Sequence, residues 1–342
     1  MLRRCIRRIC MDMSNLPSKD GPFPHPDPKS LNVLVTRDVG AALSATLEEA
    51  YTVHQRHDAE ERRDFIAAQG NIIDVVVTSG LIGISAAEMD QMPNLKFVHS
   101  FASGYESVDV AAAKARGIMV AHMPGTMAFS VAEHAIGLMI SITRGFIHND
   151  KVARETHWDE CGQHWPNLYK KRLGLLGYGN IGAEIAQRMQ GFEMEIGYHA
   201  RSRRDVPHAY FETPLALAEW ADYVIAALPG SADTKHIVDA DVLGALGPTG
   251  YFINVARGTV VDSAALDQAL RSGAIAGAGI DVAEGDPEIP TALLETPNLQ
   301  ITPHVAGQSP EAVERKLGII RANIENHLTG GEVLSPVKEM KD

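Results

Sequence analysis

Cysteine is scarce in this sequence, and its scarcity excludes two classes of protein. The chain contains three cysteines, Cys5, Cys10 and Cys161. They are too few for a disulfide framework and lack the spacing of zinc ligands. We therefore expect a protein of the reducing cytoplasm that holds no metal ion.

Long hydrophobic runs and an excess of positive charge are also missing. No apolar run approaches the roughly 18 residues of a membrane span, and the formal net charge of −12 argues against a nucleic-acid surface. We expect neither a membrane nor a nucleic acid among the partners. The 342 residues, of which 45% are hydrophobic and 22% charged, suit two globular domains of ordinary size.

The first 30 residues offer little to a folded core. Four arginines lie within residues 3–8 and a proline-rich stretch runs from Pro17 to Pro28, so we expect residues 1–30 to be a disordered leader. The arginines suit a transit peptide or an export signal, but the apolar region of about 7–15 residues that a secretory signal needs is missing. An extended reading frame upstream of Met11 or Met13 is the other interpretation.

Short apolar runs of strand length alternate with helical patterns in two series. Such alternation is typical of parallel sheets covered by helices. We predict an α/β fold of two Rossmann-like or flavodoxin-like parallel-sheet domains with a hinge cleft between them. The expected strands are Leu31–Thr36, Ile72–Thr78, Leu95–Ser100 and Ile118–Ala121 in the first series, and Leu173–Leu176, Glu195–Tyr198, Tyr223–Ala226, Gly250–Asn254, Gly277–Asp281 and Leu299–Ile301 in the second.

The same pattern predicts the domain boundaries. Residues 31–122 together with 310–337 form a substrate-binding (catalytic) domain, and residues 123–309 form a dinucleotide-binding domain. The hinge is expected near Met123 and Pro124. The amphipathic segment Pro310–Leu328 has no strand left to pair with, so we expect it to cross back to the first domain.

A glycine-rich loop lies between the predicted strand Leu173–Leu176 and a predicted helix at Ala183–Met189. In a dinucleotide site the first glycine permits a sharp turn, the second lets the backbone approach the pyrophosphate, and the third lets the helix pack on the sheet. This setting favours a cofactor site over an ordinary tight turn. The loop residues assigned to the cofactor are Gly177, Tyr178, Gly179, Asn180, Ile181 and Gly182.

The acidic residue that holds the ribose 2′-hydroxyl of NAD is missing. About 23 residues beyond Gly177, where that acid is expected, the chain reads Ala200-Arg201-Ser202-Arg203-Arg204. Guanidinium groups bind phosphate through paired hydrogen bonds. We therefore predict NADP(H) in preference to NAD(H), bound by residues 200–203; a solvated basic turn is the alternative.

Residues suited to acid and base chemistry follow three predicted strands of the second series. Arg257 comes after Asn254, the segment Asp281–Asp286 follows the next strand, and His304 follows the last. Ligands of open α/β sheets bind at these carboxyl ends. Histidine transfers protons near neutral pH and arginine binds carboxylates. Together these residues suit the reduction of a 2-oxo acid, although each by itself is also typical of a surface or capping group.

Further motifs accompany these residues: Pro93-Asn94-Leu95-Lys96, Ser103-Gly104-Tyr105, Val108-Asp109, Ala115-Arg116-Gly117-Ile118, Pro124-Gly125, Asn254-Val255-Ala256-Arg257-Gly258, Gly279-Ile280-Asp281-Val282 and Thr302-Pro303-His304-Val305-Ala306-Gly307. With the glycine loop, they make the chain resemble the D-isomer-specific 2-hydroxyacid dehydrogenases from about Leu31 to Val337. Within that family, the basic turn is most similar to that of the NADPH-dependent glyoxylate, hydroxypyruvate and 2-ketogluconate reductases.

The resemblance implies a reaction and a role for each site residue. A hydride passes from NADPH to C2 of a small 2-oxo acid such as glyoxylate or hydroxypyruvate, and the product is the D-2-hydroxy acid. Arg257 holds the substrate carboxylate and carbonyl, and His304 is the acid/base. A homodimer interface within Met123–Arg144 is implied as well. Additional cofactor contacts are expected at Ala256, Asp281, His304 and Gly307.

The chain departs from the family pattern at the acid that orients the histidine. The usual glutamate is replaced by Asp286, which is one methylene shorter. A longer-range or water-mediated contact between Asp286 and His304 is therefore expected. Glu284, two residues earlier, is the other candidate.

Backbone amides of the first domain complete the site that the resemblance implies. Ser103 and Gly104 are expected to bind the substrate carboxylate, because backbone N–H groups form a cradle for anions. Ser79 and Gly80 are a second candidate. A plain tight turn is the alternative for both pairs.

Two other functions remain open at this point. The same fold serves in a nucleotide-binding corepressor, which keeps the cofactor site without turnover, and in dehydrogenases that oxidise formate or phosphite. Turnover of a 2-oxo acid discriminates among the three.

Overall fold

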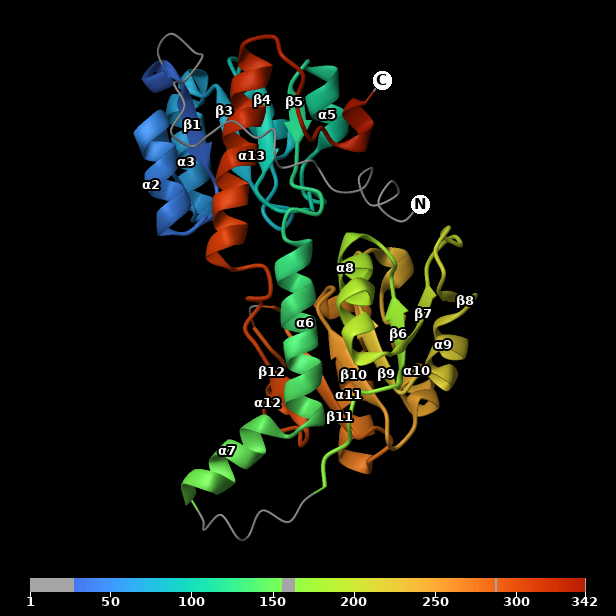
Figure 1. The fold of residues 1–342 in the computed structure, drawn as a ribbon. Coiled ribbons are helices and arrows are strands. Elements are labelled where there is room, and N and C mark those ends of the chain that lie inside the picture. The colour runs from blue at the N-terminus through green and yellow to red at the C-terminus, as the bar shows by residue number, and fades with distance from the viewer. Residues whose placement is uncertain (1–27, 156–163, 287, 342) are drawn as a thin grey trace. The chain divides into compact units, whose positions relative to one another are not determined.

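The computed structural model describes residues 28–155, 164–286 and 288–341. The chain divides into two compact units (Figure 1), one formed by Met1–Thr126 with Ser309–Asp342 and the other by Met127–Gln308. Each unit is built on one parallel sheet, which confirms the predicted pair of parallel α/β domains. In the described part of the chain, no helix has both the length and the apolar character needed to cross a membrane.

The first unit contains a five-stranded sheet in the order β2-β1-β3-β4-β5. Strands β1 and β3 are rich in valine and almost wholly buried, as expected for parallel strands covered on both faces. The edge strand β2 was missed by the sequence prediction, because its residues TVHQ are exposed or half-buried and form no apolar run. The strands are β1 (Asn32–Val35), β2 (Thr52–Gln55), β3 (Val75–Thr78), β4 (Phe97–Ser100) and β5 (Met119–Ala121).

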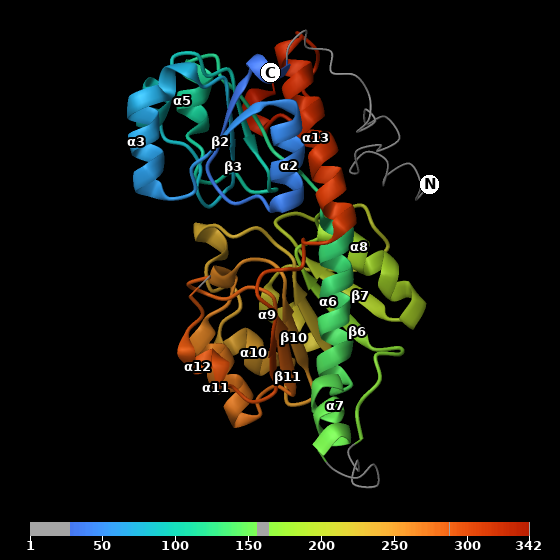
Figure 2. The ribbon, with the colours of Figure 1, turned by 90° about the vertical axis from the view of Figure 1, so that its left-hand side faces the viewer.

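Helices cover both faces of this sheet. Helices α2 (Ala41–Ala50) and α13 (Pro310–Leu328) pack on one face, where Leu43 and Ile320 enter the same core cluster, and the two helices lie side by side in Figure 2. Helices α3 (Ala59–Gln69), α4 (Ala86–Asp90) and α5 (Val110–Ala115) cover the other face. The C-terminal helix therefore belongs to the first unit.

The second unit contains a seven-stranded sheet in the order β12-β11-β10-β9-β6-β7-β8. Its edge strand β8 was also missed, because it has three residues, none of them buried. Because all the strands are parallel, the loops after β6, β7, β10, β11 and β12 lie along one edge. The strands are β6 (Arg172–Leu176), β7 (Glu195–His199), β8 (Ala209–Phe211), β9 (Tyr223–Ala226), β10 (Tyr251–Asn254), β11 (Gly277–Ile280) and β12 (Leu299–Ile301).

The helices of the second unit are shared between the two faces of its sheet. One face is covered by α6 (Ala128–Thr143) and α8 (Asn180–Met189). The other is covered by α9 (Pro214–Trp220), α10 (Ala240–Leu246), α11 (Ser263–Ser272) and α12 (Thr291–Leu294). Helix α7 (Phe146–Glu155) follows α6 and contains no buried residue.

Candidate active site

The glycine-rich loop ends β6 and begins α8, and its backbone fits a pyrophosphate. Gly177 has φ 101°, and a Cβ atom there would lie 2.7 Å from the carbonyl oxygen of Ala227. A Cβ on Gly182 would collide with the carbonyl oxygen of Gly177. Gly179 caps α8 without a side-chain hydrogen bond, and a Cβ there would meet nothing within 4 Å. The space beside Gly179, at the N-terminus of α8, is thus open, as an anion bound there requires.

The other loop residues frame this turn. Asn180 and Ile181 form the first turn of α8. The Tyr178 ring packs against Tyr198 of β7, with ring centroids 4.8 Å apart. The loop is therefore tied to the strand that leads into the basic turn.

The basic turn after β7 is exposed and held by two tyrosines. Tyr198 Oη accepts a hydrogen bond from the Arg204 amide at 2.6 Å, and Tyr210 Oη donates to the Ala200 carbonyl at 3.2 Å. Arg201, Ser202 and Arg203 are exposed, and no acidic side chain forms an ion pair with either arginine in the described residues. Their charges are available to an anion.

Asp281, at the end of β11, organises the loop that carries His304. Its Oδ1 accepts hydrogen bonds from Thr302 Oγ1 at 2.6 Å and from the Val305 amide at 2.9 Å, and its Oδ2 accepts from the Ala306 amide at 2.9 Å. His134 Nε2 lies 3.4 Å from Oδ1. Both carboxylate oxygens are thus engaged by the chain itself. Burial alone would raise the pKa of Asp281, but these hydrogen bonds lower it below its usual value.

His304 and Asp286 form a direct pair: Nδ1 of the histidine is hydrogen-bonded to Oδ2 of the aspartate. The expectation of a longer or water-mediated contact is therefore wrong. The turn at Gly285, which has φ 82°, carries Asp286 close enough despite its shorter side chain. His304 itself has φ 54°, a conformation that costs a non-glycine residue about 1–3 kcal/mol.

Glu284 is occupied elsewhere. Its Oε1 lies 2.6 Å from His236 Nε2, and its Oε2 accepts a hydrogen bond from the Ser263 amide at 3.3 Å. Burial alone would raise the pKa of Glu284, yet these contacts lower it. Of the two candidate acids, Asp286 is the one that contacts His304.

Arg257 follows β10, the strand beside β11. The buried side chain of Asn254 donates to the Arg257 carbonyl at 3.2 Å and accepts from the Ala256 amide at 3.0 Å, which fixes this bend. Ala256 is buried. No hydrogen bond joins Arg257 to His304 or Asp286 among the described residues. Gly307 packs on Met127, whose Sδ would lie 2.9 Å from a Cβ added to the glycine.

The pairs Ser79-Gly80 and Ser103-Gly104 of the first unit come together. A Cβ on Gly80 would lie 2.7 Å from the carbonyl carbon of Gly104. The Ser79 hydroxyl accepts from the Ile82 amide at 3.3 Å, and Ser103 Oγ donates to the Met123 carbonyl at 2.9 Å. The two candidate anion-binding turns therefore lie side by side.

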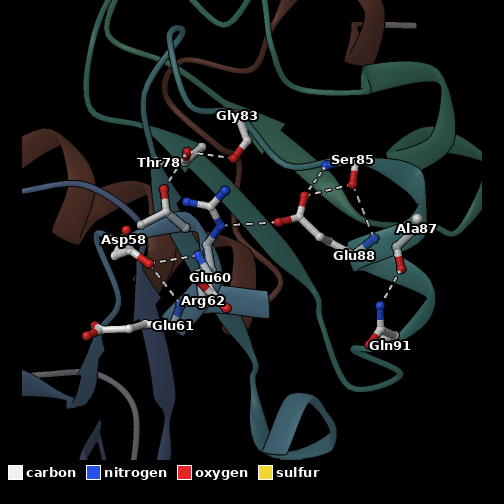
Figure 3. Close-up of polar contacts among 11 residues, drawn as sticks. Asp58, Glu60, Glu61, Arg62, Thr78, Gly83, Ser85, Ala87, Glu88 and Gln91 are labelled. Carbon is white, nitrogen blue, oxygen red and sulfur yellow. Dashed lines mark hydrogen bonds and ion pairs between the residues drawn. The ribbon is translucent and has the colours of Figure 1, made fainter. Parts of the chain in front are cut away.

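Neighbouring polar contacts brace the loop that carries Ser79 and Gly80 (Figure 3). Thr78 Oγ1, at the end of β3, donates to the Gly83 carbonyl at 2.9 Å. Arg62 of α3 pairs with Glu88 of α4 at 3.2 Å. Thr78 is thus joined across the loop to Gly83, and the helix that follows the loop is joined to α3.

Sequence reasoning missed several residues that act on the site. The Glu106 carboxylate lies against both glycines, where a Cβ on Gly104 would be 2.7 Å from its Oε1. Asn254, His134 and His236 act through the loops described above. His134 left a sequence signal as a polar residue within the apolar helix α6, and Asn254 lies in one of the motifs that carry the family resemblance.

Asp281→Asn is expected to loosen the His304 loop. A side-chain amide puts N–H groups against a backbone N–H, and an unpaired buried donor costs about 1–3 kcal/mol. Because the folded pKa of Asp281 lies below its usual 3.8, its contribution to stability is complete above that pH and is lost as pH falls through the lowered value.

The measurement is thermal unfolding of wild type and variant between about pH 7 and pH 3, with initial rates at neutral pH. The variant should melt at lower temperature at neutral pH, and the difference should shrink in acid. Asp239→Asn is the matched control, because Asp239 caps α10 and asparagine caps equally well. Equal melting of wild type and D281N would contradict the assigned role.

The family model and the relatives that match this chain agree with one another. Residues 136–306 match the family model described as D-isomer specific 2-hydroxyacid dehydrogenase, NAD binding domain. The chain is 32% identical over 311 residues to hydroxyphenylpyruvate reductase of Plectranthus scutellarioides, covering 90% of this chain and 99% of that protein. It is 33% identical over 308 residues to 2-ketogluconate reductase of Gluconobacter oxydans, covering 90% and 98%.

A solved structure extends this similarity to the fold. The NADPH-dependent glyoxylate/hydroxypyruvate reductase of Sinorhizobium meliloti, in complex with NADP and malonate, superposes with a TM-score of 0.81. The two chains are 36% identical, and the similarity covers 91% of this chain and 97% of the other.

Proposed function

Because this chain belongs to the D-isomer specific 2-hydroxyacid dehydrogenase family, a family of oxidoreductases that use nicotinamide cofactors, we propose that it reduces a small 2-oxo acid to the D-2-hydroxy acid with NADPH. The observation that carries the proposal is the direct His304–Asp286 pair, at the carboxyl edge of the sheet that also presents the glycine loop. A proton donor held at the cofactor-binding edge is what carbonyl reduction requires.

His304 donates the proton from a defined atom. Nδ1 faces Asp286, so Nε2 is the nitrogen left to face the substrate. NADPH, when bound, supplies the hydride that adds to C2. The proton from Nε2 then neutralises the oxygen, so the carbonyl becomes a C–H and an O–H bond. Asp286 fixes the orientation of the ring, as the carboxylate does in other histidine–acid pairs.

Each unit holds a group that suits the acid. The Arg257 guanidinium suits a carboxylate and stabilises negative charge that develops on the carbonyl oxygen. Ser103 and Gly104, with Gly80 beside them, supply backbone N–H groups for the carboxylate. The Glu106 carboxylate must turn away when an anion binds there, because like charges repel.

NADPH preference rests on the basic turn. Arg201 and Ser202 are exposed and follow β7 directly after Ala200, and the Sinorhizobium meliloti relative, described as NADPH-dependent, was solved with NADP. Residues 177–182 would hold the pyrophosphate, and residues 200–203 the 2′-phosphate.

The homodimer stays a prediction. Two large apolar side chains at the start of α7, Phe146 and Ile147, are 55% and 62% exposed. Exposed apolar side chains grouped in this way are typical of protein interfaces, which supports a partner surface continuing from the α6 region.

The proposal is tested by initial rates of NADPH and NADH oxidation against glyoxylate, hydroxypyruvate, pyruvate, phenylpyruvate and 2-ketogluconate. We expect turnover of at least one of these acids with kcat/KM at least about tenfold higher for NADPH, which corresponds to about 1.4 kcal/mol. Tight NADPH binding without turnover of any acid would point to a binding protein. Turnover of formate or phosphite would point to the other dehydrogenase class.

A further inference from the structure

Lys316 is a half-buried cation on α13 in the first unit. Its Nζ lies 5.8 Å from the centre of the Phe101 ring. Phe101 packs on the core beneath α2 and α13, and so does Leu317, the residue that follows Lys316 on the helix. The methylene stem of Lys316 thus runs beside apolar surface, while its ammonium lies near an aromatic ring.

Among the described residues, no acidic side chain forms an ion pair with Lys316, although Arg321 and Glu325 pair farther along the same helix. Burial lowers the pKa of Lys316 below its usual 10.5, and no charged neighbour contributes to the shift. A cation that has lost water without gaining a counter-ion stands to gain from an anionic ligand.

The place of this cation in the fold also points to a ligand. Phe101 is the first residue after β4, and its amide donates to the Thr78 carbonyl at the end of β3 at 2.9 Å. Lys316 therefore lies at the carboxyl edge of the first sheet, where α/β units bind ligands. Ser103 and Gly104 follow Phe101 by two and three residues.

We propose that Lys316 recognises a second negative charge, at the far end of the 2-oxo acid, and makes the enzyme prefer dianionic substrates. The assignment rests on the proposed function. There the Ser103-Gly104 amides of the same unit already serve the reacting carboxylate, so a further cation suits a further anionic group. A lysine, as a point charge on a flexible stem, accepts either a carboxylate or a phosphate.

The experiment compares two acids with the same five-carbon chain: 2-oxoglutarate, whose far end is a carboxylate, and 2-oxopentanoate, whose far end is a methyl group. Steady-state kcat and KM are measured for wild type, Lys316→Met and Lys316→Arg. Lys171→Met, at an exposed lysine of the second unit, is the matched control.

We expect wild type to favour 2-oxoglutarate by at least about tenfold in kcat/KM. K316M should lose that preference through a raised KM for 2-oxoglutarate, with kcat nearly unchanged and 2-oxopentanoate turned over as by wild type. K316R should keep most of the preference, and K171M all of it. A structural role would instead lower the rates on both acids together.

Two results would overturn the assignment: a wild-type enzyme with no preference for the dianion, or a K316M variant that retains it. If wild type reduces neither acid nor any other 2-oxo acid, the proposed function has failed instead. Calorimetric binding then still tests Lys316. The assignment is supported if wild type binds 2-oxoglutarate more tightly than 2-oxopentanoate and K316M loses this difference. It is overturned if wild type binds the two acids equally.

Discussion

Replacing Asp286 by asparagine is expected to lower kcat for 2-oxo acid reduction by about 10²- to 10⁴-fold, the range that a correctly held acid–base residue contributes. The aspartate is hydrogen-bonded directly to His304 Nδ1. Asparagine keeps the size of the side chain but removes the negative charge that faces the ring. It also presents an N–H group as readily as an oxygen, so the ring loses the acceptor that fixes Nε2 as the donor. His304→Gln should lower kcat at least as far.

Glu284 provides a matched control for this experiment. It lies two residues earlier on the same loop and carries the same charge, but it contacts His236 and Ser263. We expect Glu284→Gln to change kcat much less than D286N does. Affinity for NADPH, followed by its fluorescence on binding, should be nearly the same in D286N and wild type. A larger kcat loss in E284Q than in D286N would reverse the assignment of the orienting acid.

Replacing Arg201 by alanine is expected to lower the preference for NADPH over NADH by about 10- to 100-fold in kcat/KM. A charge-assisted hydrogen bond to phosphate contributes about 1.5–3 kcal/mol. The loss should arise in KM for NADPH, because the 2′-phosphate lies far from the transferred hydride. Adding Ala200→Asp should raise activity with NADH, because an acid at this position accepts the ribose hydroxyl.

Arg63→Ala serves as the control for R201A, because Arg63 is an exposed arginine on α3 of the other unit. It should leave both cofactors unaffected. If R201A lowers the rates with NADPH and NADH equally, Arg201 does not bind the 2′-phosphate. Serine at position 202 would then need testing on its own.

Some features of the site follow from neighbouring residues in the chain, and others depend on tertiary contacts. The glycine loop was predicted because its three glycines meet local needs of one turn, and the structure shows those needs at Gly177 and Gly182. The acid that pairs with His304 could not be chosen from neighbouring residues. Asp286 and Glu284 differ by two positions, and only the turn at Gly285 and the place of His236 decide which acid reaches the histidine.

The amino-acid sequence by itself determined the two α/β series, the strand–loop–helix of the cofactor site and the basic turn, because hydrophobic periodicity and turn chemistry act between near neighbours. The sequence did not reveal β2 and β8, because these edge strands form by pairing with a neighbouring strand and contain no apolar run. Only the tertiary structure decided that Gly80 meets Gly104, that Glu106 covers both, and that Lys316 lies beside Phe101 with no ion-pair partner in the described part of the chain. These contacts join residues far apart in the chain, so their charges and distances exist only once the sheets and helices have packed.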